Sequence, residues 1–431
     1  MKKSKQFGGV LSALTLAAVM AFMTGAKGEE VIDIDSLDKL QKIGEDEEFP
    51  LDGHYILTSD IRPSSQEDFE PIGDFANRFT GVFDGNGHVI TGLSIHRPGN
   101  NYVGLFGYVG DGGEVRNVVL KDCEITGGRA VGGLVGQNAG TISESHANVE
   151  VAGDQYVGGL IGWNEGKVAE SHATGTVEGE ERVGGLVGEQ EEGGKISNSY
   201  AIGDVSGIAA VGGLVGRNFQ GQIEETFATG TVTGEGHVGG LIGVNAGPSA
   251  KVSNSYATGT VDGKGGNRVG GLIGYVTYYS KVINSYSVGE VSGGTDVGGL
   301  VGERDGRGEV TASFWDITTS GQEESAGGDG VQGKITDDMQ DKSTFTDAGW
   351  NFDDIWAIDE GTYPYLINNP PEVFGDVTGS GSVGADDLQA VINAVLGLDV
   401  DADYEPDVNG DGSVDALDVQ LVILVLLGLL G

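Results

Sequence analysis

Oxygen-bearing side chains recur at alternate positions near the C-terminus, between Asp407 and Asp418. Carboxylate, amide and carbonyl oxygens are the ligands that Ca²⁺ prefers, and Gly412 permits the sharp turn that a twelve-residue calcium loop needs. The spacing therefore predicts a calcium site rather than a solvated acidic turn. Its ligands would be Asp407, Asn409, Asp411, the Ser413 carbonyl, Asp415 and Asp418.

A second copy of this pattern precedes it, between Asp376 and Asp387. Its oxygen donors are Asp376, Thr378, Ser380, Ser382 and Asp387, and Gly384 contributes no side chain. Fewer carboxylates mean weaker calcium binding. This loop either binds calcium weakly or is a degenerate copy that binds none.

Each loop runs into a stretch with the apolar spacing of a helix, and the two stretches share one apolar stripe. The second stretch alone adds Leu421, Leu424 and Val425, which would form a second apolar face. An exposed apolar face usually marks a contact surface. We expect this face to bind a partner protein or the last coil of the preceding domain.

The two loop–helix halves resemble a type I dockerin. That resemblance implies folding with Ca²⁺ and binding to a cohesin module of a partner protein. It places recognition positions at Ala416 and Leu417, whose counterparts in the first half are Ala385 and Asp386. The closing aspartates, where the family has glutamate, and the degenerate first loop are departures from the family pattern.

One group of side chains in the middle of the chain is a candidate for acid–base catalysis. Glu144 and His146 occupy the same repeat position as Glu170 and His172, so the four side chains would lie together on neighbouring coils. In later repeats the histidine position is aromatic, as Tyr200, Phe227, Tyr256 and Tyr286. The alternatives are a catalytic or transition-metal site, a strip of rings that stacks on sugars, and a ladder of rings that stabilises the coils.

These side chains belong to a repeat. The pattern Val-Gly-Gly-Leu-(Val/Ile)-Gly begins at Val131 and recurs to Val297, with intervals of 26 to 31 residues. Periods of this size with short β runs and glycine turns predict a mainly β protein, a right-handed parallel β-helix solenoid with one coil per repeat from about residue 80 to 315. The segments on either side, 31 to 80 and 316 to 366, would cap it.

Stacked coils place equivalent residues above one another, so inward positions should form ladders. Glycines around the Leu-Val pair are expected to turn the backbone at positive φ and to let coils approach. The predicted inward leucines are Leu134, Leu160, Leu186, Leu214, Leu241, Leu272 and Leu300. Hydrogen-bonding ladders are expected at Asn138, Asn164, Asn218 and Asn245, and at Ser145, Ser171, Ser199, Ser255 and Ser285.

The repeats resemble the GLUG-motif repeats of bacterial surface and secreted proteins, some of which are attached to IgA-specific metallopeptidases. The stretch from Phe79 to His88 and the closing Ser313-Phe314-Trp315-Asp316 are similar to that family's flanks. The resemblance implies a surface or adhesive role and supplies no catalytic residue. No His-Glu-x-x-His motif occurs in the chain.

The amino-acid composition disfavours some classes of binding partner. The 431 residues include 79 glycines, one cysteine, 24 basic and 65 acidic residues, with a net charge of -41. Such a charge disfavours nucleic acid and anionic membranes. A single cysteine allows no intrachain disulfide.

The ends of the chain predict export. Residues 1–26 read as a signal peptide, with a basic start, an apolar stretch and small residues at the cleavage position. The apolar run 421–427 is far shorter than the roughly 20 residues that span a bilayer, so the mature protein should not span the membrane. The predicted order is a signal peptide (1–26), a GLUG-repeat β-helix with caps (27–366), a linker (367–374) and a dockerin-like module (375–431).

Two functions fit this organisation. One is an exported, non-catalytic surface, adhesion or assembly protein that a calcium-dependent module attaches to a cohesin-like or other surface protein. The alternative is a polysaccharide-active lyase or glycoside hydrolase that the same module recruits to a complex. Both place the protein outside the cell or on its surface.

Overall fold

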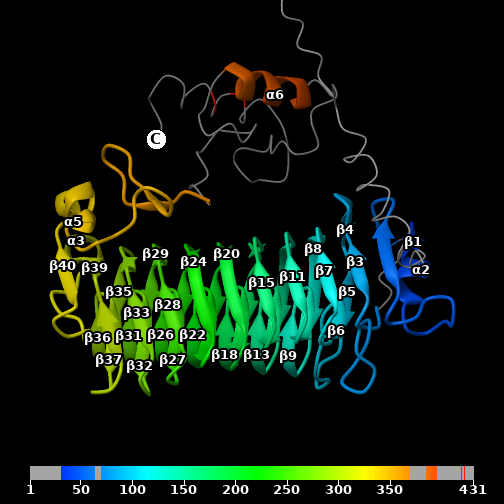
Figure 1. Cartoon of the computed structure of the whole chain (residues 1–431), viewed down its shortest axis with the longest axis horizontal. Coiled ribbons are helices and arrows are strands. Elements are labelled where there is room, and N and C mark those ends of the chain that lie inside the picture. The colour runs from blue at the N-terminus through cyan, green and yellow to red at the C-terminus, as the bar shows by residue number, and fades with distance from the viewer. Residues whose placement is uncertain (1–30, 64–68, 369–384, 396–418, 420–421, 423–431) are drawn as a thin grey trace, which may run out of the picture. The chain divides into compact units, whose positions relative to one another are not determined.

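The computed structural model describes residues 31–63, 69–368, 385–395, 419 and 422. The chain divides into two compact units, residues 1–339 and 340–431. In the first unit, short parallel strands stack in chain order from blue to yellow in Figure 1. This unit is a parallel β-solenoid of about 9 turns, and its described residues contain few helices.

Three stacks of strands form the walls of the solenoid. An eight-stranded parallel sheet contains β6 (Phe106–Val109), β10 (Val135–Asn138), β14 (Ile161–Asn164), β19 (Val187–Gln190), β23 (Val215–Phe219), β27 (Ile242–Ala246), β32 (Ile273–Thr277) and β37 (Val301–Arg304). A seven-stranded parallel sheet contains β9 (Arg129–Gly132), β13 (Gln155–Gly158), β18 (Glu181–Gly184), β22 (Ala209–Gly212), β26 (Gly236–Gly239), β31 (Asn267–Gly270) and β36 (Thr295–Gly298).

The remaining strands of the solenoid join into one sheet of 25 strands. They are β1 (Val31–Ile34), β2 (His54–Leu57), β3 (Val82–Asp84), β4 (Val89–Thr91), β5 (Ser94–His96), β7 (Glu114–Arg116), β8 (Val119–Thr126), β11 (Thr141–Ser143), β12 (His146–Ala152), β15 (Lys167–Ala169), β16 (His172–Ala173), β17 (Val177–Glu178), β20 (Lys195–Ala201), β21 (Val205–Ser206), β24 (Gln222–Ala228), β25 (Val232–Thr233), β28 (Lys251–Ser253), β29 (Tyr256–Ala257), β30 (Val261–Asp262), β33 (Lys281–Ile283), β34 (Tyr286–Ser287), β35 (Val291–Ser292), β38 (Glu309–Thr311), β39 (Ser313–Asp316) and β40 (Val331–Lys334).

The solenoid extends beyond the limits expected from the glycine motif. Strand β1 pairs in parallel with β2, and β2 pairs with β3, so regular coils begin at residue 31 rather than near residue 80. At the other end β40 pairs with β39, beyond residue 315. Alternation of inward and outward side chains is enough to make these strands, and the outer coils therefore need no Val-Gly-Gly-Leu motif.

The core is a set of ladders, as the repeat spacing predicts. All seven predicted leucines, from Leu134 to Leu300, are at most 1% exposed. Valine rungs such as Val157 and Val183 lie in register on adjacent strands and are fully buried. Cys123 is also buried, at 1% exposure, as a small core residue.

The coil corners differ from expectation. The glycines of the Val-Gly-Gly-Leu motif are not among the described positions with positive φ. Instead, the residue before each motif valine has a left-handed backbone, with φ between 53° and 61° at Tyr102, Ala130, Tyr156, Arg182, Ala210, His237, Arg268 and Asp296. The motif glycines serve close approach: a Cβ on Gly185 would lie 2.1 Å from the Gly213 carbonyl oxygen. The motif glycines therefore allow the coils to approach because they lack side chains, and not because of their backbone dihedral angles.

Short helices flank or follow the solenoid strands. They are α2 (Leu37–Gln41), α3 (Ile317–Ser320) and α4 (Thr336–Met339) in the first unit, with α5 (Lys342–Thr346) and α6 (Ala385–Val395) in the second. The second unit also contains the antiparallel pair β41 (Trp356–Ala357) and β42 (Tyr365–Leu366). Trp350 and Trp356 pack there with ring centroids 4.6 Å apart.

Candidate functional site

Six rings form a continuous stack on the 25-stranded sheet. The stack comprises His146, His172, Tyr200, Phe227, Tyr256 and Tyr286, with successive ring centroids 3.8, 4.5, 4.7, 4.9 and 5.1 Å apart. From His172 onward the ring planes differ by 6° to 12°. Parallel strand register explains this, because each ring lies directly above its equivalent in the next coil.

The two histidines of the stack do not form an acid–base pair with the neighbouring glutamates. Glu144 and Glu170 lie at left-handed corners, with φ of 47° and 50°, and are exposed, and no hydrogen bond joins either glutamate to a histidine among the described contacts. Burial lowers the pKa of His146, and Glu144 offsets part of this shift. Burial and the adjacent His146 lower the pKa of His172 to about 3. Both imidazoles are neutral at pH 7 and serve as rungs of the ring stack.

The His172→Tyr variant should lose acid sensitivity. The pKa of His172 is about 3 in the folded protein, against about 6.5 in an unfolded chain. As pH falls below 6.5 the unfolded state therefore gains a proton that the folded state does not accept, and the free energy of unfolding decreases. At pH 5 this costs at most about 2 kcal/mol. Tyrosine occupies the same position in the next coil. Because tyrosine does not gain a proton in this pH range, the substitution removes the loss of unfolding free energy that His172 causes at low pH.

The measurement compares melting temperatures at pH 7.5 and pH 5. We expect the His172→Tyr variant to gain relative to the parent protein only at the lower pH. His96→Tyr, at an exposed position, is the matched control and should keep the parent pH dependence. Equal pH slopes for the His172→Tyr variant and the parent would contradict the assignment.

The stack geometry also decides how the aromatic side chains are used. A sugar that stacks on an aromatic residue needs a free ring face, but the faces of Phe227 and Tyr256 are covered by their neighbours in the stack. Phe227, Tyr256 and Tyr286 are 6%, 4% and 1% exposed. Of the alternatives given above, the geometry therefore favours ring-on-ring stabilisation over a sugar-stacking strip of Tyr200, Phe227, Tyr256 and Tyr286.

Buried polar ladders run inside the coils. Asn138 Nδ2 donates to Asn164 Oδ1 at 2.8 Å, and Asn164 Nδ2 donates to Gln190 Oε1 at 2.7 Å. Asn218 Nδ2 likewise donates to Asn245 Oδ1 at 2.8 Å. The asparagine ladder is confirmed. Gln190 also belongs to it, which the sequence pattern missed because this position carries glutamine instead of asparagine.

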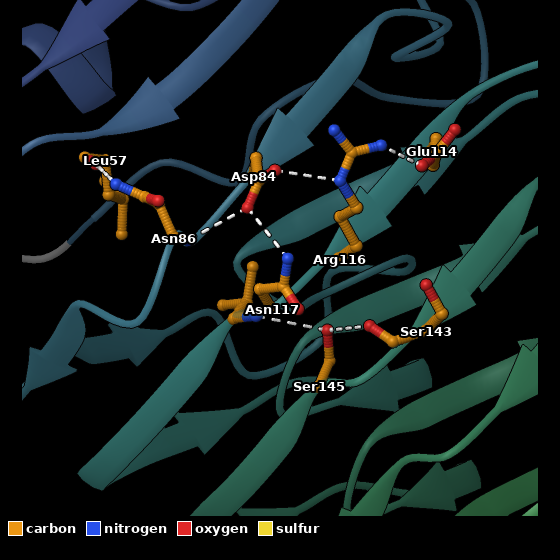
Figure 2. Close-up of polar contacts among 9 residues, drawn as sticks. Leu57, Asp84, Asn86, Glu114, Arg116, Asn117, Ser143 and Ser145 are labelled. Atoms are coloured by element: carbon orange, nitrogen blue, oxygen red, sulfur yellow. Dashed lines mark hydrogen bonds and ion pairs between the residues drawn. The ribbon is translucent and has the colours of Figure 1, made fainter. Parts of the chain in front are cut away.

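The serine ladder works through the backbone. The Ser145 hydroxyl donates to the Ser143 carbonyl at 2.8 Å (Figure 2). The same hydroxyl accepts the amide of Val118 at 3.2 Å. The Ser145 amide in turn donates to Ser171 Oγ at 3.2 Å. Each of these hydroxyls thus accepts a hydrogen bond from a backbone amide at the corner of the preceding coil.

A cluster around Asp84 joins the first coils in the same way (Figure 2). Asp84 accepts hydrogen bonds from Arg116 Nε at 2.8 Å, from Asn117 Nδ2 at 3.0 Å and from the Asn86 amide at 2.9 Å. Arg116 also pairs with Glu114. Burial raises the pKa of Asp84, but these hydrogen bonds outweigh it and hold the pKa below its ordinary value. A carboxylate with all these partners is a structural link between coils.

Sequence reasoning missed a second row of interacting side chains on the solenoid. We call it the arginine–aromatic strip: it lies at the corner between the seven- and eight-stranded sheets, and its central members are Arg129, Tyr156, Trp163, Arg182, Glu189 and Arg217. The guanidinium groups of Arg129 and Arg182 lie 4.4 and 4.7 Å from the Tyr156 ring centroid. Both groups donate to the Tyr156 hydroxyl, at 3.0 and 2.6 Å.

Glu189 anchors the strip from inside. Its side chain is fully buried, and its carboxylate lies 2.7 Å from Arg217 Nη2 and 3.4 Å from Arg182 Nε. Complete burial raises the pKa of Glu189 to about 8, and the two arginines offset part of that rise. Since the residue types change from coil to coil, no sequence repeat marks this strip. The available signal was the position of its members, one or two residues before the glycine motif or directly after it.

The predicted calcium ligands of both loops, including Asp407 and Asp376, lie outside the described residues, apart from the α6 backbone at Asp387. So do Ala416, Leu417, Leu421, Leu424 and Val425, and the predicted signal peptide at residues 1–26. The helix expected after the first loop is present as α6, which begins at Ala385. Its Val391, in the expected apolar stripe, is fully buried.

The fold and the loop sequences define a class: a parallel β-solenoid followed by a calcium-type loop–helix module. Comparison with known proteins gives both parts a family. The GLUG motif matches residues 153–178, 179–206, 207–233, 234–262 and 265–292, and a dockerin type I domain matches residues 374–427. The chain therefore carries GLUG repeats and a type I dockerin domain, as its motifs indicated. Type I dockerin domains bind calcium.

Two curated proteins are similar to this chain. One is named "Putative Gly-rich membrane protein", from Evansella cellulosilytica, and is 42% identical over 75% of this chain and 42% of its own length. The other is "Halomucin" from Haloquadratum walsbyi, 37% identical over 27% of this chain and 1% of its own length. The chain thus spans less than half the length of either relative.

A solved structure is also similar. Its title describes a "putative immunoglobulin A1 protease" from Bacteroides ovatus, and the match has 17% identity and a TM-score of 0.43 over 80% of this chain and 94% of that one.

Within the described ranges, no helix combines the length and apolar composition needed to cross a bilayer. Those ranges also contain no group of three or more His, Cys, Asp or Glu side chains placed to hold a metal ion.

Proposed function

We propose that this protein is an exported, non-catalytic β-solenoid that its calcium-dependent dockerin domain attaches to a protein partner. The observation that carries the proposal is the type I dockerin match over residues 374–427, next to a solenoid with GLUG repeats. A dockerin implies assembly into a complex through a cohesin partner. Together with the repeats, it favours an extracellular or surface location.

The sequence around the second loop supports the calcium step. Asp407, Asp411 and Asp415 supply carboxylates, and Asn409, Ser413 and Asp418 supply further oxygens, a donor set that suits a hard cation. Residues 369–431 contain aspartate and glutamate but neither lysine nor arginine. Without calcium, the loop carboxylates would repel one another. Calcium therefore couples folding of the module to partner binding.

The solenoid contributes a rigid unit to display. Its core leucines are buried, and its buried amides and hydroxyls form hydrogen bonds from coil to coil. The His146 and His172 side chains are uncharged at pH 7 and stack with the other rings. The Glu144, His146, Glu170 and His172 group gives no acid–base arrangement that would support catalysis. Attachment through the dockerin would place the solenoid on the outside of an assembly.

The test uses the full mature chain and a purified type I cohesin. We expect binding in Ca²⁺ and at least a hundredfold weaker binding in EDTA. The Asp411→Ala variant removes a calcium ligand and should lose both calcium and cohesin. Leu424→Asn changes only the predicted contact face, so it should keep calcium and lose cohesin.

The matched control is Asp353→Ala, an acidic residue outside both calcium loops, which should bind as the parent does. Cohesin binding that survives EDTA would overturn the calcium step. Calcium binding without capture of a cohesin or a defined surface protein would overturn the attachment role.

A further inference from the structure

Among the residues that the structure describes, no carboxylate pairs with Arg129, although the chain is strongly acidic. The protein has 65 acidic and 24 basic residues, yet among the described residues no Asp or Glu forms an ion pair with Arg129. Other arginines of the same strip are paired: Arg182 and Arg217 with Glu189, and Arg268 with Glu303. Its charge is therefore not used for internal pairing.

The surroundings of Arg129 are aromatic. Its guanidinium lies 4.4 Å from the Tyr156 ring centroid and 5.2 Å from that of Trp163. The two rings meet edge to face, with centroids 5.4 Å apart. Arg129 and Trp163 are half-buried, so part of this corner faces solvent. Cation–π contacts and the hydrogen bond to the Tyr156 hydroxyl hold the cation in place, and no salt bridge does so among the described residues.

Two N–H donors of this corner find no acceptor on the described protein. They are Arg129 Nε and Trp163 Nε1, and both are buried. A buried donor without an acceptor is unfavourable, so a small side-chain shift that brings it to a ligand oxygen is favoured. The corner thus places a planar cation, an indole side chain and two N–H donors next to one another.

We propose that Arg129, Tyr156 and Trp163 form a binding site for a glycan that carries a carboxylate. A guanidinium matches a carboxylate in shape and charge. The solvent-facing part of the half-buried Trp163 side chain gives a sugar ring an apolar contact. The indole N–H suits a sugar hydroxyl. This inference is independent of the proposed attachment through the dockerin.

Charge decides the kind of glycan. At physiological ionic strength, interactions between exposed charges are largely screened beyond about 8 Å. Arg129 therefore attracts a single carboxylate at close range, while the net charge of -41 repels a dense polyanion. The favoured ligand is a glycan with isolated uronic acid residues.

The test is a set of oligosaccharides that contain glucuronate, galacturonate or mannuronate, each with its carboxyl-reduced counterpart. Binding to the full mature chain is measured by calorimetry in Ca²⁺. We expect at least one acidic form to bind tenfold or more tightly than its reduced counterpart. The Arg129→Gln variant should lose that preference.

The matched control is Arg268→Gln. Arg268 lies 4.7 Å from the Tyr275 ring, in the same kind of cation–π contact, but it is already paired with Glu303. This variant should retain the preference within twofold. Trp163→Leu should weaken the acidic and the reduced forms alike, because it removes the surface shared by both.

Three results would overturn the proposal. They are the absence of any preference for the acidic forms by the parent chain, an unchanged preference in the Arg129→Gln variant, and an equal loss in the Arg268→Gln variant. The parent measurement does not depend on how any variant folds. A cohesin-binding assay on the same preparation separates failure of this site from failure of the dockerin.

Discussion

Replacing Gly203 with alanine is expected to destabilise the solenoid by about 3 kcal/mol, at the upper end of the usual cost of overpacking. A Cβ at this position would lie 1.8 Å from the Gly175 carbonyl oxygen in the preceding coil. Because the atom in the way belongs to the backbone, no rotamer change can relieve the clash. The coils would have to separate, and the hydrogen bonds between them would lengthen.

Gly306 provides the control for this substitution. It is an exposed glycine with no atom within 4 Å of the position its Cβ would take. Gly306→Ala should therefore change the free energy of unfolding by no more than about 0.5 kcal/mol. Denaturant unfolding followed by circular dichroism measures both variants. Similar stabilities for the two would show that the solenoid tolerates wider coil spacing than its geometry implies.

The second large effect is expected for Leu214→Ala, which removes one rung of the leucine ladder. Leu214 is fully buried between the equivalent leucines of the adjacent coils, Leu186 and Leu241. Truncating a buried leucine costs about 2–5 kcal/mol, because the removed methyl groups leave a cavity. Each coil contacts only its neighbours, so the loss should be local to three coils.

Hydrogen exchange reads out this prediction directly. Amides of β18, β22 and β26 should exchange faster in the Leu214→Ala variant, whereas those of β9 and β36 should change little. Ile208→Ala is the control in the same coil, since Ile208 is 48% exposed. A uniform rise in exchange along the solenoid would contradict nearest-neighbour stacking, because it would mean that the coils unfold as one unit.

The repeat period alone was enough to predict the class of fold and the core. A solenoid repeats the same inward positions in each coil, so Leu134, Leu160 and their equivalents could be assigned from spacing. The same reasoning found the Asn138–Asn164 ladder and the Ser145–Ser171 ladder. The resemblance to a type I dockerin was confirmed as well, because its loop pattern lies within a short stretch of sequence and needs no tertiary contact to be recognised.

Spacing was less informative where the residue type changes from coil to coil. Gln190 continues a ladder of asparagines, and coils without the glycine motif begin at Val31. In both places the backbone position matters and the residue type does not. The motif glycines were expected to adopt positive φ and to let the coils approach, and only the close approach is confirmed. Both roles call for glycine, and a sequence does not separate them.

The sequence by itself determined what repeats: the coils, their leucine, asparagine and serine ladders, and the calcium-type loops. Only the tertiary structure decided what the outward side chains do, because that depends on the neighbours in the coils above and below. It showed that the faces of the inner rings from His172 to Tyr256 are covered by their neighbours, so they are closed to a ligand. It also brought together Arg129, Tyr156 and Trp163, which lie on neighbouring coils and share no motif. A cation without a carboxylate partner becomes visible only when the space around it is known.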